Sequence, residues 1–147
     1  MLPFDVTLGT GESPYRQVVY AATKAILSGV MTPGDAFPSV RELSQALKIN
    51  PNTAQKVVAE LVRDGLLAVH PGIGTIVTAA PDGGSADRER LLDAGVEQLV
   101  VEARRLGLAQ NDLQHAIGAR WIALFGAHGV APTDPHVTTP TPERGRR

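Results

Sequence analysis

Apolar and polar positions between residues 38 and 66 follow a pattern that predicts two short helices joined by a tight turn. The first helix follows Ser39, which is spaced from Glu42 as in a capping box. The second helix begins after Asn50, a favourable N-cap, and ends before Gly65, which suits a left-handed C′ position. Its expected buried stripe is Ala54, Val57, Val58, Leu61 and Val62. Its opposite face is polar in the N-terminal half, as in the recognition helix of a helix-turn-helix.

The residues after this pair of helices predict a β-hairpin. Residues 66–69 and 75–78 are two short β-prone runs, and the sequence HPGIG connects them. A hairpin directly after a recognition helix is a wing. The expected fold class is therefore mainly α (α+β), with a winged helix-turn-helix in the N-terminal half and a short two-helix module after it.

The elements around the helix-turn-helix are also predicted by hydrophobic periodicity. Residues 1–13 alternate apolar positions and suggest an arm or short strand on the body, and a helix is expected over about 14–28. After a Gly-rich linker at 79–85, two helices are expected over about 86–105 and 111–125. Their apolar stripes are Leu92, Val96, Leu99, Val100 and Ala103 in the first, and Leu113, Ile117, Trp121 and Leu124 in the second. Two helices of this size cannot bury these stripes alone, so we expect them to pack against a second copy of the chain.

The composition of the 147 residues narrows the class of protein. The chain has no cysteine, which excludes disulfides, cysteine-type zinc sites and thiol catalysis. No apolar run approaches the roughly 18 residues of a membrane span and no signal peptide is recognisable, so we expect a cytoplasmic location. The net charge of −1 counts weakly against nucleic-acid binding, although residues 14–80 hold six basic and four acidic residues. DNA binding would therefore depend on the local placement of charge and on dimerisation.

Five sequence motifs occur in the order and at the spacing seen in a known family. They are PYRQV from Pro14, SGVMTPGD from Ser28, PSVRELS from Pro38, NPNTAQK from Asn50 and GIGTIV from Gly72. Residues 14–78 therefore resemble the DNA-binding domain of the GntR family of bacterial transcriptional regulators, and the NPNT motif resembles the YtrA-type branch of that family. The resemblance implies that the two C-terminal helices dimerise, as the short two-helix tails of this branch do.

The candidate base-reading residues lie in the first half of the expected recognition helix. In winged-helix proteins this part of the helix enters the major groove, which places Asn52, Gln55 and Lys56 near base edges. Asn and Gln pair bidentately with adenine, and Lys donates to guanine or to phosphate. The alternative is that these are ordinary solvent-facing residues of a helix.

Other candidates suit the DNA backbone. Thr53 and the free N–H groups at the start of the recognition helix suit a phosphate. The arginine in the family's P-S-x-R motif contacts DNA, so the resemblance implies the same role for Arg41. Asn50 is expected mainly to cap the helix, with any DNA contact secondary. In the wing, Gly72 lets the backbone approach a phosphate or the minor groove, and His70 can donate when protonated, with a structural role as the alternative.

The wing departs from the family pattern. Family wings usually carry Arg or Lys beside the first glycine, whereas this chain has Pro71 and Ile73 on either side of Gly72. We therefore expect the wing to add less electrostatic affinity, and binding to depend more on the recognition helix.

No catalytic motif or cofactor motif is present, so we expect neither an enzyme nor a bound cofactor. A metal site is not expected either, because His115, His128 and His136 are scattered without a second ligand at i+4. Trp121 and Phe125 have the spacing of core residues, with a small-molecule pocket as the alternative interpretation. No effector is identifiable from the residues.

These observations predict a winged helix-turn-helix DNA-binding domain at 1–80, an α-helical dimerisation module at 81–129 and a disordered tail at 130–147. The expected function is sequence-specific transcriptional regulation, by a homodimeric repressor bound to a palindromic operator in double-stranded DNA. The alternative is a winged-helix module for protein interaction or assembly without sequence-specific DNA binding. The near-neutral charge and the wing with few basic residues are the reasons for this alternative.

Overall fold

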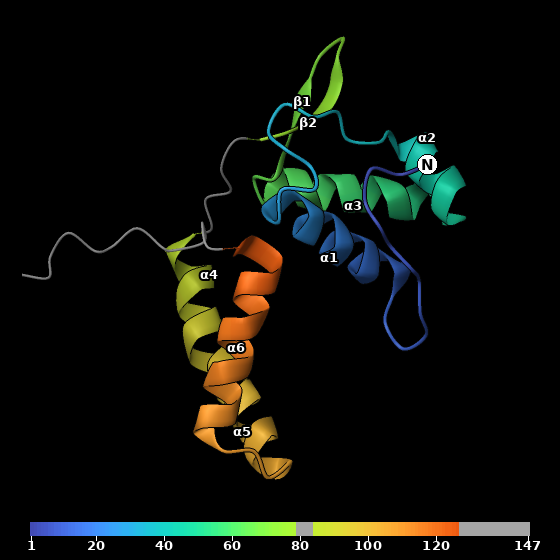
Figure 1. The fold of residues 1–147 in the computed structure, drawn as a ribbon. Coiled ribbons are helices and arrows are strands. Elements are labelled where there is room, and N and C mark those ends of the chain that lie inside the picture. The colour runs from blue at the N-terminus through green and yellow to red at the C-terminus, as the bar shows by residue number, and fades with distance from the viewer. Residues whose placement is uncertain (79–83, 127–147) are drawn as a thin grey trace, which may run out of the picture.

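The computed structural model describes residues 1–78 and 84–126. The first range combines helices with a hairpin and loops, and the second is mostly helical (Figure 1). The elements in chain order are α1 (Pro14–Leu27), α2 (Val40–Leu47), α3 (Pro51–Arg63), β1 (Leu67–His70), β2 (Gly74–Val77), α4 (Ser85–Arg90), the π-helical segment η1 (Leu91–Gly95), α5 (Val96–Arg105) and α6 (Gln110–Phe125). Three helices followed by a two-stranded hairpin form a winged helix-turn-helix, and further helices follow it. The predicted fold class, mainly α with a small sheet, is confirmed.

Side-chain caps fix the starts of α1 and α2. At α1, the Arg16 N–H donates to Ser13 Oγ at 3.3 Å. At α2 the capping box is complete, because the Glu42 N–H donates to Ser39 Oγ at 3.1 Å and the Ser39 N–H donates to Glu42 Oε2 at 3.0 Å. Caps of this kind satisfy N–H groups that a helix start leaves unpaired, and each stabilises the helix by about 1 kcal/mol. Both predicted helix starts are confirmed.

An apolar core joins the first three helices. α3 packs against both α1 and α2, and its residues Ala54, Val57 and Leu61 have no exposed surface. The predicted stripe of α3 is confirmed, with Val62 only partly buried at its edge. The other buried residues of this core are Phe4, Val18, Ala22, Ala25, Ile26, Met31, Phe37, Leu43, Val58, Leu66, Leu67 and Val77. Each large side chain buried in this way contributes roughly 1.5–3 kcal/mol, so the core holds α3 firmly on the body.

α3 ends in a left-handed turn at Gly65, as predicted. The Gly65 N–H donates to Val62 O at 3.1 Å, and the Leu66 N–H donates to Leu61 O at 2.9 Å. This pair of bonds is a Schellman motif, which requires positive φ at its C′ residue, and Gly65 has φ +76°. Leu66 then enters the core, so the motif directs the chain into β1.

β1 and β2 form an antiparallel hairpin from the Leu67–Val77 pair at the base to the His70–Gly74 pair at the tip. Both strands are shifted by one residue from the predicted runs. At the base, Leu66 belongs to the motif that ends α3. At the tip, the Ile73 N–H donates to His70 O at 3.0 Å, which closes a turn shorter than the predicted HPGIG connection. The predicted strand limits were therefore wrong by one residue.

The loop before α2 pairs with the free edge of β2, which the sequence pattern did not predict. The Phe37 N–H donates to Thr75 O at 2.8 Å, and the Val77 N–H donates to Asp35 O at 2.9 Å. These bonds flank an isolated antiparallel bridge between Ala36 and Ile76. The base of the wing and the entry to α2 are therefore tied together.

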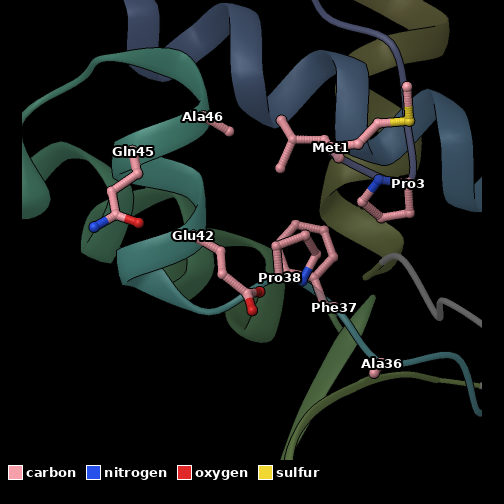
Figure 2. A pocket seen from close by; sticks show the side chains of 9 residues that line it. Met1, Pro3, Ala36, Phe37, Pro38, Glu42, Gln45 and Ala46 are labelled. Atoms are coloured by element: carbon pink, nitrogen blue, oxygen red, sulfur yellow. The ribbon is translucent and has the colours of Figure 1, made fainter.

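The N-terminal arm, residues 1–13, packs on the body and contains no strand. Phe4 is buried at one end of the arm. At the other end Gln17 of α1 holds the backbone, because the Gly9 N–H donates to Gln17 Oε1 at 2.7 Å and Gln17 Nε2 donates to Gly9 O at 3.0 Å. A hollow of about 540 Å³ remains between the first residues and α2, and Pro3 and Glu42 lie in its wall (Figure 2). The Glu42 carboxylate already serves there as part of the α2 cap.

Residues 85–105 form one helical run in which α4, η1 and α5 follow one another, and α6 returns after a tight turn (Figure 1). The two predicted C-terminal helices are confirmed to within a residue at each limit, but the π-helical segment was not predicted. Leu91 Cδ1 lies 3.2 Å from the position that a Cβ on Gly95 would occupy, so a side chain there would crowd the widened turn.

Two side-chain hydrogen bonds flank the turn between α5 and α6. Arg105 Nε donates to Glu102 Oε2 at 2.9 Å, and this bond holds the pKa of the Glu102 carboxyl below its ordinary value. The Ala109 N–H donates to Asp112 Oδ2 at 2.8 Å, which caps the start of α6. The turn is thus fixed locally, by groups that are exposed to solvent.

Parts of the predicted organisation fall outside the described residues. Of the predicted linker at 79–85, only Gly84 and Ser85 are described, and Ser85 is the first residue of α4. The predicted tail at 130–147 lies wholly outside, and the domain boundaries stay predictions. Within the described ranges, no helix has both the length and the apolar character needed to cross a membrane.

Candidate nucleic-acid interface

The N-terminal half of α3 presents a polar row opposite its buried stripe. Asn52, Gln55 and Lys56 are exposed, whereas Ala54 and Val57 have no exposed surface. Because these three polar positions lie three and four residues apart, their side chains share one face of the helix. One face of α3 therefore holds the helix on the body, and the other is free to enter a groove.

The first turn of α3 suits an anion. Asn50 Oδ1 accepts a hydrogen bond from the Asn52 N–H at 2.8 Å, so the predicted capping role of Asn50 is confirmed. Pro51 has no N–H and the Ala54 N–H donates to Asn50 O, so the donors left in this turn are the N–H and hydroxyl of the half-buried Thr53. The helix dipole adds positive potential at this end. A phosphate group fits these donors.

Arg41 is exposed in the first turn of α2, between the two capping-box residues Ser39 and Glu42. The turn between α2 and α3 is also fixed, because the Ile49 N–H donates to Ser44 O at 3.2 Å and Ser44 Oγ donates to Ile49 O at 2.8 Å. α2 packs on α3, with Leu43 fully buried. Arg41 and the polar row of α3 are therefore held in one rigid unit.

Lys48 lies in the turn between these helices, with φ +53° and ψ +43°. Among the described residues, Lys48 is the only non-glycine residue with positive φ. This conformation costs a residue with a Cβ about 1–2 kcal/mol. The residue is exposed and lies two positions before the cap of α3. Lys48 was not predicted as a site residue, although a basic residue next to a recognition helix is itself a signal for DNA binding.

The wing tip combines exposed apolar residues with the two candidates predicted there. His70 and Gly72 are exposed, and Gly72 has φ +75° in the turn that the Ile73 N–H closes. Ile73 is 75% exposed and Val69 is 62% exposed. The hairpin projects away from the helices, so these side chains are presented to the surroundings (Figure 1).

The structure thus divides the predicted site residues between two places. One group lies on α2, α3 and the cap of α3, and consists of Arg41, Asn50, Asn52, Thr53, Gln55 and Lys56. The other group, His70 and Gly72, lies at the tip of the hairpin. Lys48 and Ile73 lie near these groups and were not predicted as site residues.

The C-terminal helices carry a different kind of surface. Among their described residues only Ala103 is buried, and the predicted stripe residues Leu92 and Trp121 are 73% and 51% exposed. We use the name C-terminal apolar surface for the exposed large apolar residues Leu91, Leu92, Val96, Leu99, Val100, Val101, Leu106, Leu108, Ile117, Trp121 and Ile122. Large apolar side chains exposed in this number on two helices are typical of an interaction surface.

Metal-ligating residues do not gather anywhere in the described ranges. No group of three or more His, Asp or Glu side chains there is placed to hold a metal ion. His128 and His136, two of the scattered histidines, lie outside the described residues.

Comparison with known proteins identifies a family and similar regulators. The family described as "Bacterial regulatory proteins, gntR family" matches residues 14–77. The HTH-type transcriptional repressor YtrA of Bacillus subtilis (strain 168) is 32% identical over 108 residues, which cover 70% of this chain and 80% of that protein.

Two solved structures share the fold. A transcriptional antiterminator from Listeria monocytogenes EGD-e superposes with a TM-score of 0.71 at 22% identity, over 87% of this chain and 98% of that one. A GntR family transcriptional regulator from Listeria monocytogenes superposes with a TM-score of 0.55 at 26% identity, over 76% of this chain and 98% of that one. The first of these likenesses extends over the winged helix and most of the C-terminal helices.

Proposed function

The chain belongs to the GntR family of bacterial regulatory proteins, in its YtrA-like branch, and on this premise we propose that it is a homodimeric transcriptional repressor that binds a palindromic operator. The observation that carries the proposal is the exposed polar row of Asn52, Gln55 and Lys56 on a helix whose opposite face is buried. The similarity to a protein named as a repressor supports the direction of regulation.

In this proposal the first half of α3 enters the major groove. The groove is about 12 Å wide, and a helix with its side chains is about 10–12 Å across, so the fit leaves the polar row against base edges. The amides of Asn52 and Gln55 suit the N6 and N7 positions of adenine. The Lys56 ammonium suits guanine O6 and N7, or a phosphate.

Contacts to the DNA backbone would surround this row. Arg41 at the start of α2 and the first turn of α3 both offer donors suited to phosphate oxygens. Lys48 adds a third basic side chain beside them. This local clustering of positive charge offsets the net charge of −1 for the whole chain.

The C-terminal apolar surface supports the proposal that the protein is a homodimer. A second copy of the chain presents the same surface, and a two-fold arrangement buries both at once. Such a dimer carries two α3 helices related by two-fold symmetry, which requires a palindromic operator. Its half-sites should lie about 10 bp apart, or a multiple of this spacing.

The experiment that tests this function is a selection of duplexes from a random DNA pool, together with the molar mass of the free protein from light scattering. We expect a palindrome to be enriched by a protein with the mass of a dimer. The affinity for the enriched duplex should fall steeply with salt, because each phosphate contact is doubled in the dimer.

Two other results would each contradict part of the proposal. If no duplex is enriched at low salt, the function as a DNA-binding regulator is excluded, and the winged helix is instead a module for protein interaction. If a non-palindromic site is enriched by a monomer, DNA binding stands and the dimer is excluded. Where a variant removes a positive charge from the polar row, as Lys56→Ala does, Lys24→Ala on α1 serves as the matched control.

A further inference from the structure

The hollow between the N-terminal arm and α2 has the size of a small-molecule site. Its volume is about 540 Å³, and such sites usually measure roughly 300–1,000 Å³. Three segments of the chain form its wall, namely the arm at residues 1–3, the loop at residues 36–38 and α2. We propose that this hollow binds a small organic cation, in which an amine is joined to an apolar group.

Much of the wall is apolar. The arm contributes Leu2 and Pro3, the loop contributes Phe37 and Pro38, and α2 contributes Ala46. Phe37 and Pro38 are buried in the body, so they form the floor of the hollow. An apolar group of a ligand placed against these residues is removed from water, which favours binding.

The polar part of the wall lies on α2. Glu42, Gln45 and Ala46 follow one another at helical spacing on one side of the hollow, and Pro3 lies across from them (Figure 2). Glu42 carries a negative charge, and no Lys, Arg or His of the described ranges lines the hollow. The charge of the lining side chains therefore favours an ammonium group and repels a carboxylate.

The carboxylate of Glu42 has room for a ligand beside its role in the helix cap. Its Oε2 accepts a hydrogen bond from the Ser39 N–H at 3.0 Å, and Oε1 accepts no hydrogen bond from the described part of the chain. An ammonium group can donate to Oε1 while the cap stays intact. Because the cap already orients this carboxylate, little conformational entropy is lost when a ligand binds.

The opposite wall is also fixed. Phe4, which follows Pro3 in the arm, is only 5% exposed and belongs to the core. Further along the arm, Gln17 Nε2 donates to Gly9 O at 3.0 Å. The arm is thus attached to the body at two places, and the hollow between it and α2 exists before a ligand arrives.

Size distinguishes a small molecule from a protein as the occupant. A specific protein interface buries about 800 Å² on each partner and involves roughly 20–30 residues a side. Nine residues line the hollow. A compact molecule can contact most of them at once, whereas a protein partner would need a larger surface around them.

The test uses tryptamine as the probe and indole-3-propionate as its anionic counterpart, because the two carry the same ring with opposite charges. Amide chemical shifts of the full chain are followed by NMR at pH 7 as each compound is added. We expect tryptamine to shift the amides of Phe37, Glu42 and Ala46 with a Kd on the order of 1 mM, which is usual for a ligand of this size. Indole-3-propionate should leave these amides unchanged.

Two variants assign the binding to the hollow. Glu42→Gln removes the charge but keeps a side chain that can complete a capping box, so α2 should fold normally. We expect this variant to bind tryptamine about fivefold more weakly. Ala46→Phe places a ring in the hollow from an exposed position and should abolish the shift at Phe37. Glu89→Gln removes an exposed carboxylate from α4 and should bind tryptamine like the wild type.

Three results would overturn the inference. The first is an equal response of the same amides to both compounds, since the charge of Glu42 would then select nothing. The second is wild-type affinity for tryptamine in Glu42→Gln and Ala46→Phe, or shifts confined to other helices. The third is a changed molar mass of the free Ala46→Phe protein, which would make the hollow a contact between copies. None of these measurements involves DNA, so the proposed function is tested separately.

Discussion

The ring of Phe4 stacks on the ring of Phe37, with 5.8 Å between the ring centroids and 15° between the planes. Both side chains are only 5% exposed. Phe37 precedes Pro38 and Ser39, and Ser39 caps α2. The N-terminal arm is therefore part of the core that supports the start of the helix-turn-helix.

The Phe4→Ala substitution should lower the free energy of unfolding by about 3 kcal/mol, because it leaves a cavity against Phe37. Urea denaturation of the purified protein measures this change. Tyr20→Ala is the control, since Tyr20 is 67% exposed and its loss should change stability by less than about 0.5 kcal/mol. Equal midpoints for Phe4→Ala and the wild type would show that the arm does not stabilise the fold.

The Lys48→Gly substitution should raise the free energy of unfolding by roughly 0.5–1 kcal/mol. Glycine adopts the left-handed conformation without steric cost, which stabilises the folded state. Part of this stabilisation is lost, because glycine has greater conformational freedom in the unfolded chain. Lys48→Ala removes the same charge but keeps a Cβ, so thermal unfolding of the two variants separates conformation from charge. A glycine variant no more stable than the alanine variant would argue against strain at this turn.

The Lys56→Ala substitution should weaken operator binding by about 1–3 kcal/mol if Lys56 contacts a guanine, and by less if it contacts only a phosphate. A repeated selection with the variant distinguishes these cases, because a lost base contact relaxes the preference at one position of each half-site. Lys24→Ala should leave binding unchanged. If Lys56→Ala binds the operator with wild-type affinity, Lys56 does not contact the DNA.

The Leu92→Lys substitution should shift the protein from dimer to monomer in light scattering. Leu92 is 73% exposed, so little contact within the protomer is lost, whereas a charge would be buried between copies. Binding to the complete palindrome should then fall by about a hundredfold or more, since each protomer must bind alone. Val30→Lys, which places the same charge on the winged helix, should remain dimeric.

Local side-chain chemistry allowed most of the winged helix to be predicted. Ser39 with Glu42, Asn50 with proline after it, and Gly65 each act within a few residues of their own position. The helix limits around them were therefore predictable from sequence. The alternation of buried and exposed positions along α3 likewise follows from helical geometry, which is why the polar row could be predicted.

The features that were missed depend on contacts between distant residues or on details of backbone geometry. The pairing of Phe37 with Thr75 joins segments far apart in sequence, and nothing in either segment requires it. The strand limits depended on how tightly the chain turns at Gly72, which a Gly-rich connection does not specify. Apolar spacing alone could not distinguish a continuous α-helix from one with a π-helical turn.

That π-helical turn, residues 91–95, affects how this chain is compared with others. A π turn contains about one residue more than an α turn, and one residue of α-helix corresponds to a rotation of about 100°. A relative whose helix is regular throughout would therefore align with this chain only if a gap of one residue is placed in this segment. Without that gap, every position of α4 would be assigned to a place about 100° away around the helix, and an unchanged contact surface would be mistaken for a divergent one.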